Sequence, residues 1–321
     1  MLRRISIHLS FQITLLSFFC AFAKSDIALI TNQEANTVDV IDLKKREKIS
    51  EIFVGKKPAG IFIDKSTKTF FTSNPGSNNI SMFKLNSSKH NFLNSGKSPM
   101  SIQLDHKKNL LFVSNWFENQ ISIIDINKNK ILSKINVGKS PAGIYLSNNA
   151  QLYIAVKGEN IVTVVDIASQ KKIKDIKVGK APYGVFSSKN TNFLFVTNVQ
   201  SNSVTIIDKT SLSVKANINV GSWPYQIAFE KKKKILFVTN QRDNSISIIN
   251  LKKFEVTKTL EDVCEYPEGI DISYNENLIV VACWFEDNII LLDLNSYKLI
   301  KKIKVSGGPR SFGNFILENY E

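Results

Sequence analysis

Residues 220–250 read VGSWPYQIAFEKKKKILFVTNQRDNSISIIN, and this stretch decides the fold. It holds three runs rich in β-branched and aromatic residues, at 225–229, 235–239 and 245–249, and a fourth run follows at 257–260. Residues typical of turns separate the runs, and short runs of this kind between turn signals predict strands. The stretch therefore predicts four antiparallel strands that follow one another along the chain.

The same unit recurs through most of the sequence. Seven of the eight prolines are spaced 41 to 43 residues apart, namely Pro58, Pro99, Pro141, Pro182, Pro224, Pro267 and Pro309. Around them the unit reads V-G-x-x-P-x-G, then an apolar run, then L-F-V-T-N, then N-S-V-T-I-I-D. Four short strands in about 42 residues are typical of a propeller blade. No run has the 3.6-residue spacing that a helical solenoid of similar period requires.

The two ends of the chain predict how the propeller closes. The N-terminal part begins with the second strand of a blade, at Ile27–Thr31, and the C-terminal part ends with a lone first-strand run, at Phe312–Leu317. We therefore expect an all-β, seven-bladed β-propeller of four-stranded antiparallel blades, in which the C-terminal strand joins the N-terminal blade. Closure of this kind removes the open sheet edges at which chains aggregate.

The repeats resemble those of the YVTN family of β-propellers. The sequence FVTN at 195–198 and again at 237–240 carries the signature of that family, with Phe in place of Tyr. The resemblance extends over nearly all of the chain after residue 23. It implies the seven-bladed architecture but no particular ligand.

Most repeated residues are expected to build the scaffold. The repeat glycines, such as Gly221, are expected to supply unusual φ angles in the turns between blades. Asparagines that end the second strands and open the third, such as Asn198 and Asn202, are expected to satisfy turn backbone groups. Aspartates that end third strands, such as Asp208, are expected to cap the next turn. Because there is one such carboxylate per blade, spread around the ring, they are not expected to bind a metal.

The first 23 residues have the pattern of a signal peptide. Arg3 and Arg4 precede an apolar run that ends in Ala21-Phe22-Ala23, the small-x-small pattern at which signal peptidase cleaves. The alternative is an uncleaved membrane anchor. We expect cleavage after Ala23, a propeller domain over 24–321 without a transmembrane segment, and a periplasmic or secreted location.

The net charge is +14, yet only five of the 42 basic residues are Arg. Proteins that read nucleic acids usually rely on Arg for bidentate contacts. Lysines are grouped in the loops that follow first and third strands, and we name the face that these loops form the back. A solvated lysine-rich back is the favoured interpretation, and weak contact with an anionic surface is the alternative.

Candidate binding residues are concentrated on the opposite face, which we name the front. All three tryptophans fall in front loops, and the position after the repeat Pro carries two Tyr, one Glu and one Arg in four successive blades. The candidate set is Trp116, Tyr183, Trp223, Tyr225, Tyr266, Glu268, Trp284 and Arg310. Aromatic rings with a few converging polar groups are typical of a ligand pocket or an interaction hot spot. The alternative is that these aromatic side chains only pack between neighbouring blades.

The sequence contains few residues suited to catalysis. After residue 23 it has two histidines, His90 and His106, which belong to an outer strand and a back loop. Haem-binding propellers of periplasmic nitrite reductases resemble this repeat family, but the front face lacks the axial histidine that they need. Seven-bladed lactonases share the architecture, and Glu268 with Arg310 is the one pair suited to polarising a lactone. We expect no metal and no cofactor.

Two cysteines, Cys264 and Cys283, remain after residue 23. They replace the Gly before Pro267 and the Asn at the end of the second strand of the same blade. These positions are neighbours at the front edge of one hairpin, and an exported protein folds in an oxidising compartment. We expect a disulfide between them, and two free thiols are the alternative.

These observations favour an exported, monomeric binding or scaffold propeller without catalytic activity, which recognises a protein or small molecule through its aromatic front. A lactonase centred on Glu268 and Arg310 is the first alternative. Salt-dependent binding of an anionic polymer, such as single-stranded nucleic acid, is the second.

Overall fold

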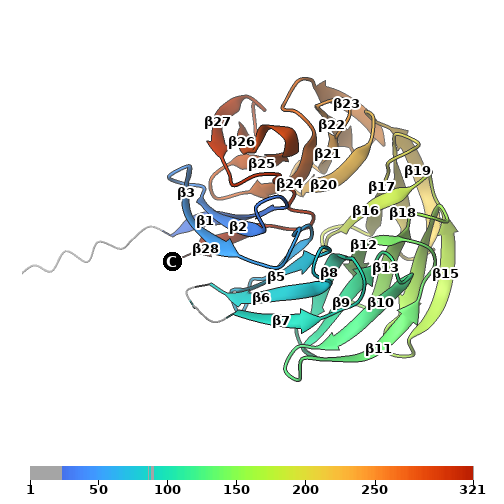
Figure 1. The fold of residues 1–321 in the computed structure, drawn as a ribbon. Helices are drawn as coiled ribbons and strands as arrows, with labels where there is room; N and C mark the ends of the chain where they lie inside the picture. Colours follow the sequence, from blue (N-terminus) through green and yellow to red (C-terminus); the bar gives the residue numbers. More distant parts are fainter. Residues whose placement is uncertain (1–23, 86, 88–89, 321) are drawn as a thin grey trace, which may run out of the picture.

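The computed structural model describes residues 24–85, 87 and 90–320, so the expected signal peptide, residues 1–23, lies outside the described part. The fold is all-β, with seven four-stranded antiparallel sheets arranged in a ring (Figure 1), and we name the region enclosed by the inner strands the channel. This confirms the expected seven-bladed propeller. Among the described residues no helix has the length and apolar character needed to cross a membrane.

Each blade runs from an inner to an outer strand. Blade 1 has β28 (Ile316–Tyr320), β1 (Ser25–Asn32), β2 (Thr37–Asp42) and β3 (Glu47–Phe53). Blade 2 has β4 (Ile61–Asp64), β5 (Thr69–Asn74), β6 (Asn79–Lys84) and β7 (His90–Asn94). Blade 3 has β8 (Pro99–Asp105), β9 (Leu110–Asn115), β10 (Gln120–Asp125) and β11 (Lys130–Asn136). Blade 4 has β12 (Pro141–Leu146), β13 (Gln151–Val156), β14 (Ile161–Asp166) and β15 (Lys171–Lys177). Blade 5 has β16 (Pro182–Ser187), β17 (Phe193–Asn198), β18 (Ser203–Asp208) and β19 (Ser213–Asn219). Blade 6 has β20 (Pro224–Glu230), β21 (Ile235–Asn240), β22 (Ser245–Asn250) and β23 (Glu255–Leu260). Blade 7 has β24 (Pro267–Ser273), β25 (Leu278–Cys283), the 3₁₀ turn η1 (Trp284–Glu286), β26 (Asn288–Asp293) and β27 (Leu299–Lys304).

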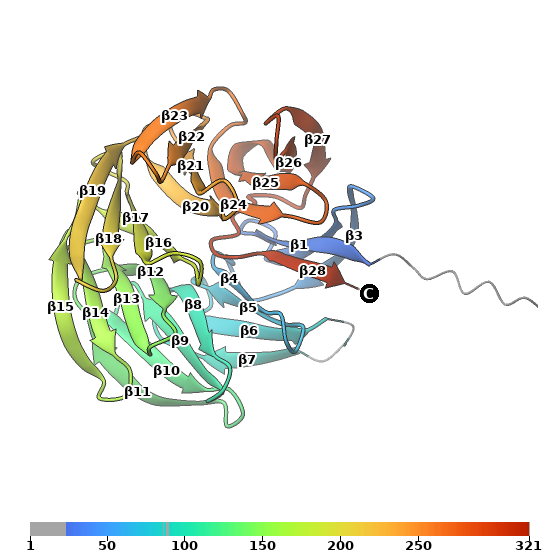
Figure 2. The ribbon, with the colours of Figure 1, turned by 180° about the vertical axis from the view of Figure 1, so that it is seen from behind.

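The C-terminal strand closes the ring. Strand β28 lies beside β1 in both views of the ribbon (Figures 1 and 2), and the two pair antiparallel with Ile27 opposite Leu317 and Ser25 opposite Tyr320. The C-terminal strand, about 300 residues from β1 along the chain, thus completes the blade that the N-terminal strands begin, as the sequence predicts. Strand β28 covers the edge of β1, which would otherwise be open for pairing with another chain.

The predicted bounds of the closing strand were wrong. The sequence predicts a strand at Phe312–Leu317, whereas β28 begins at Ile316. Gly313 has a φ of +133°, and its N–H and C=O bond the side chain of Gln226. The buried carboxylate of Asp271 then accepts the N–H groups of Phe315 and Ile316. These contacts pull the chain out of the strand path, so residues 309–320, which we name the closing segment, contribute side chains to the channel before they join the sheet.

Neighbouring blades are joined by a repeated asparagine contact. The N–H of Trp223, the residue before the repeat Pro, donates to Oδ1 of Asn202 in the preceding blade at 3.2 Å. The same contact occurs at all seven blade junctions, where the acceptors are Asn36, Asn78, Asn119, Asn160, Asn202, Asn244 and Asp287. The expectation that side chains satisfy turn backbone groups is confirmed for the residues that open third strands, and the turn in question belongs to the next blade. It is wrong for Asn198, which ends a second strand and donates to the hydroxyls of Ser203 and Thr205.

The expected role of the repeat glycines is wrong for most of them. The positive φ occurs at the residue before Pro, for example Trp223 at 57°, whereas Gly138 is the one Gly of the repeat position with a positive φ. Gly221 is required for space instead, since a Cβ there would lie 2.6 Å from the Asn240 amide. That amide donates to Ser245 and Ser247 on the next strand. The aspartates behave as expected, and Asp208 accepts the N–H groups of Thr210 and Ser211.

Candidate functional site

The side chains that follow the repeat prolines meet at the front of the channel. In chain order they are Ala59, Met100, Ala142, Tyr183, Tyr225, Glu268 and Arg310. Met100, Tyr183 and Tyr225 form one buried apolar cluster with Phe312 of the closing segment. The ring of Phe312 lies 5.1 Å from that of Tyr183 and 5.4 Å from that of Tyr225, between centroids. These rings pack against one another and close the front of the channel.

A hydrogen-bonded network connects the four polar members of this layer. The Arg310 Nε–H donates to Tyr225 Oη at 2.9 Å, and the Tyr225 hydroxyl donates to Tyr183 Oη at 3.3 Å. Arg310 Nε also lies 2.9 Å from Glu268 Oε2, an ion pair, while Glu268 Oε1 accepts the Gln241 amide at 2.9 Å. Because the Nε hydrogen points to Tyr225, Glu268 Oε2 has no hydrogen bond among the described residues. The sequence therefore identified four residues that do come together, and it missed Gln241 and Phe312.

Burial controls the protonation of this network. Glu268 is completely buried, and desolvation raises its pKa to about 7 although the Arg310 charge opposes the rise. Desolvation also raises the pKa of Tyr225 far above its ordinary value. Burial disfavours the charge of Arg310, but Glu268 and the phenols outweigh it, and the pKa of Arg310 is raised. Near neutral pH the carboxyl therefore exchanges a proton while the guanidinium stays charged.

The tryptophans form a rim around this closed layer. Trp284 stacks on Phe285 at 5.7 Å and meets Tyr266 edge-on at 5.8 Å. Arg310 Cζ lies 5.4 Å from the Trp284 ring, and Trp223 has Arg242 over its face at 3.6 Å. Phe285 is 67% exposed, so aromatic surface reaches the solvent in blade 7. Tyr183 and Tyr225 thus pack inside the channel, as the packing alternative expects. The tryptophans border its mouth, and their role in binding stays a prediction.

Lys157 is the rim residue that the sequence did not suggest. Its Nζ lies 4.8 Å from the Trp116 ring and 5.9 Å from the Tyr183 ring. Burial lowers its pKa, and the positive charge of Arg310 lowers it further. Lys157 follows β13 directly, as Trp116 follows β9 and Trp284 follows β25. This shared position in the repeat is the sequence signal that could have identified Lys157 as a rim residue.

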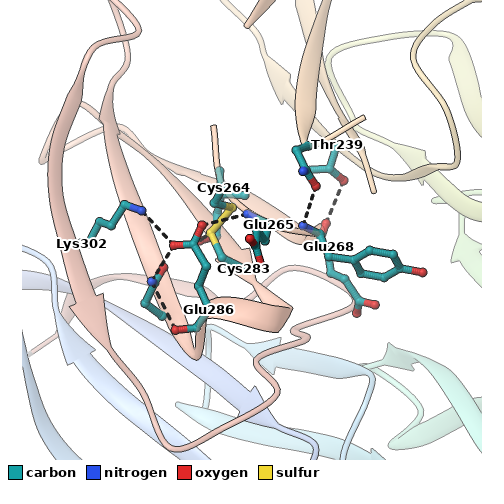
Figure 3. The surroundings of a disulfide bond; sticks show 11 residues. Thr239, Cys264, Glu265, Glu268, Cys283, Glu286 and Lys302 are labelled. Atoms are coloured by element: carbon teal, nitrogen blue, oxygen red, sulfur yellow. Dashed lines mark hydrogen bonds and ion pairs between the residues drawn. A yellow bond between two sulfur atoms is a disulfide. The ribbon is translucent and has the colours of Figure 1, made fainter. Parts of the chain in front are cut away.

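The two cysteines form a disulfide, with sulfurs 2.12 Å apart and Cα atoms 5.9 Å apart. It ties the loop before β24 to the end of β25, with Cys264 shortly before Glu268 and Cys283 directly before Trp284 in the chain. Figure 3 shows it beside Glu286, whose carboxylate accepts the Glu265 N–H and a hydrogen bond from Lys302, both at 2.8 Å. The front edge of blade 7 is thus covalently and electrostatically fixed.

A histidine–carboxylate pair lies on the back face. His106 Nδ1 is 2.9 Å from Asp64 Oδ2, and Ser66 Oγ donates to Asp64 Oδ1 at 2.6 Å. Nothing in the repeat pattern indicates that the back ends of β4 and β8 hold such a pair. The pair is remote from the front layer, since each residue ends or follows an inner strand at its back end. No group of three potential metal-ligating side chains occurs in the described ranges.

Comparison with known proteins gives one family match. The model of the lactonase family, described as a seven-bladed β-propeller, matches residues 23–134. That segment covers blades 1 to 3 without the closing segment, so it does not include Glu268 or Arg310. Among curated proteins, none matches the chain.

Solved structures resemble the chain in fold at low identity. A functionally unknown protein from Desulfotomaculum acetoxidans has a TM-score of 0.78 at 13% identity, over 92% of this chain and 99% of that one. A candidate 6-phosphogluconolactonase from Bacteroides fragilis has a TM-score of 0.74 at 14% identity, over 90% and 97% of the two chains. The dihydro-heme d1 dehydrogenase NirN has a TM-score of 0.68 at 9% identity, over 91% of this chain and 75% of that one. At these identities the likeness concerns the fold.

Proposed function

We propose that this chain is an exported binding propeller of the YVTN-repeat kind, which recognises an anionic group of a partner or small molecule at its front mouth. Cleavage after Ala23 would release residues 24–321 into the periplasm or the medium. The binding itself requires no catalytic step.

The environment of Lys157 is the main support for this proposal. Its ammonium group is half-buried on two aromatic rings, and no carboxylate in the described part of the chain forms an ion pair with it. The nearby charge of Arg310 opposes it, and two like charges in a partly desolvated site favour an anionic ligand. Trp116, next to Lys157, and Trp284, next to Arg310, offer flat apolar surface, as is typical of a binding hot spot.

Affinity capture tests the proposal. Immobilised protein comprising residues 24–321 is incubated at about 0.15 M salt, where surface attraction is largely screened, with exported proteins and metabolites of the native host. Mass spectrometry should identify an anionic species that the wild type retains and Lys157→Met releases. Lys180→Met is the matched control, because Lys180 is an exposed lysine of another front loop.

Two outcomes contradict the proposal. Equal retention by the wild type and Lys157→Met would place binding elsewhere. If Lys157→Met and Lys180→Met both lose the captured species when the salt concentration is doubled, the binding would be diffuse attraction of an anionic polymer. Melting curves of both variants show whether the fold is intact. N-terminal sequencing of the protein from its native host tests export, and a retained Met1 would indicate an anchor.

Lactone hydrolysis is the second candidate function, favoured by the family match and by the pKa of Glu268. A carboxyl with a pKa of about 7 is suited to acid–base catalysis, and Arg310 could polarise a carbonyl. Glu268 is completely buried, however, so a substrate would have to displace Arg310 to reach it. Turnover of a lactone panel that includes 6-phosphogluconolactone tests this candidate. Loss of activity by at least about 100-fold in Glu268→Gln would support it, and wild-type rates equal to spontaneous hydrolysis would exclude it.

A further inference from the structure

Behind the closed front layer, the channel contains a cavity of about 100 Å³. Its walls are formed by the back halves of the inner strands and by the closing segment. Four aromatic side chains line it, namely Phe62, Tyr145, Phe186 and Phe312. An engineered apolar cavity of about 150 Å³ binds benzene, so one six-membered ring is the upper limit of what this smaller cavity could hold.

The polar part of the cavity lining is rich in hydrogen-bond donors. Gln103 uses its Oε1 to accept the Leu146 N–H at 3.4 Å, which leaves its NH₂ group to face a ligand. The side chain of Asn314 has no hydrogen-bond partner among the described residues and also borders the cavity. No Asp or Glu belongs to the described lining. A ligand that supplies acceptors is therefore favoured over one that supplies donors.

A half-buried lysine stands at the rim of the same cavity. Lys209 Nζ donates to Ser187 Oγ at 2.9 Å and lies 5.5 Å from the ring of Tyr145, and both partners line the cavity. Burial alone lowers its pKa, and no described carboxylate forms an ion pair with it. A partly buried cation without a counter-charge favours the approach of an anion.

An adjoining hollow extends the rim. It shares Phe186 and Asn314 with the cavity and includes Lys65 and Lys231. Lys65 is paired there with Glu318, which also borders the hollow, at 3.3 Å. The Asp271 carboxylate in the wall uses both oxygens for backbone N–H groups. Lys209 and Lys231 are thus the lysines of this rim that form no ion pair with a described carboxylate, and aromatic rings surround the interior.

We propose that this back cavity binds a monocyclic carboxylate, with the ring among Phe62, Tyr145 and Phe186 and the carboxylate at Lys209. This site is separate from the front mouth, because the layer of Tyr183, Tyr225 and Phe312 lies between them. It does not depend on the proposed function of the front.

Calorimetric titration of residues 24–321 with benzoate tests the site, with benzyl alcohol and acetate as probes that lack the charge or the ring. Benzoate should bind, and both other probes should bind at least about tenfold more weakly, since a charged hydrogen bond and the buried ring each contribute that much. Lys209→Met should weaken benzoate by about tenfold or more. Lys215→Met, an exposed lysine of the same blade, should leave it unchanged.

Gln103→Phe is a second variant, which places a ring of its own in the cavity and should abolish benzoate binding while the melting temperature is retained. Lys157→Met should not affect benzoate, which separates this test from that of the front mouth. The proposal is overturned if benzoate does not bind at 10 mM, on the order of the weakest affinity worth measuring. It is also overturned if Lys157→Met weakens benzoate and Lys209→Met does not.

Discussion

The front and back halves of the channel are built by the same inner strands and the same closing segment, yet they differ in how they are filled. The residues after the repeat prolines are joined at the front by an ion pair, hydrogen bonds and ring contacts among Arg310, Glu268, Tyr225 and Tyr183. Three positions further along the strands, Phe62, Gln103, Tyr145 and Phe186 surround empty space instead. A symmetrical scaffold thus acquires distinct sites through the side chains at two strand positions, without any change in its backbone plan.

The largest effect is expected from removing the part that serves both halves. Deleting residues 312–321 removes the Phe312 ring from the front, Gly313 and Asn314 from the back, and β28 from blade 1. The exposed inner edge should abolish the cooperative unfolding of the whole domain, measured by calorimetry. Phe285→Ala, which removes an exposed ring, is the control. A truncated protein with the original melting temperature would contradict the observed closure.

Breaking the disulfide should loosen the front alone. The cysteines are 19 residues apart, and closing a loop of this size stabilises by about 3 kcal/mol in the chain-entropy estimate. Cys264→Ser with Cys283→Ser should lower the free energy of unfolding by that amount in denaturant titrations. Benzoate affinity at the back should not change in the folded variant. Equal stability of both proteins in the absence of reductant would show that the bond does not form.

The pH dependence of stability should come in part from the front carboxyl. Because the pKa of Glu268 is about 7 in the folded protein, against an ordinary 4.5, folding takes up a proton between these values. The stability of the wild type should therefore fall relative to Glu268→Gln as the pH rises, by about 2 kcal/mol from pH 5.5 to 8. Urea titrations at both pH values measure the difference. Glu265→Gln, an exposed change in the same loop, should show no such trend, and a pH-independent difference for Glu268→Gln would contradict burial of an ionising carboxyl.

The smallest effect compares one phenol from each half. Tyr225→Phe removes the acceptor of the Arg310 hydrogen bond and the donor to Tyr183, and should cost about 1 to 2 kcal/mol. Tyr145→Phe at the back should cost less, because its side chain is half-buried beside the cavity and not in a buried network. The two variants are compared by their denaturation midpoints. A larger loss of stability for Tyr145→Phe than for Tyr225→Phe would contradict the conclusion that the hydrogen-bonded network lies at the front.

Much of the front site could be predicted, since the residues after each repeat proline must meet if the propeller closes. That argument placed Tyr183, Tyr225, Glu268 and Arg310 together correctly. It did not distinguish residues that pack inside the channel from residues that border it, because side-chain direction depends on what the opposite blade supplies. Lys157 was missed because a lysine occurs once at the repeat position where blades 3 and 7 carry tryptophan. A residue type that occurs once at a repeat position does not stand out in the pattern.

The sequence by itself determined the number of blades, the four-stranded plan and the closure, because these follow from turn chemistry and strand-length runs that act over a few residues and recur in phase. Only the tertiary structure decided that Gly313 bends the closing segment, that the front is sealed, that Glu268 has a pKa of about 7 and that a cavity remains behind it. Those properties depend on residues such as Tyr225 and Arg310, which are 85 positions apart and meet only when the ring is closed. Desolvation and packing depend on these long-range contacts, so they cannot be predicted from a local sequence pattern.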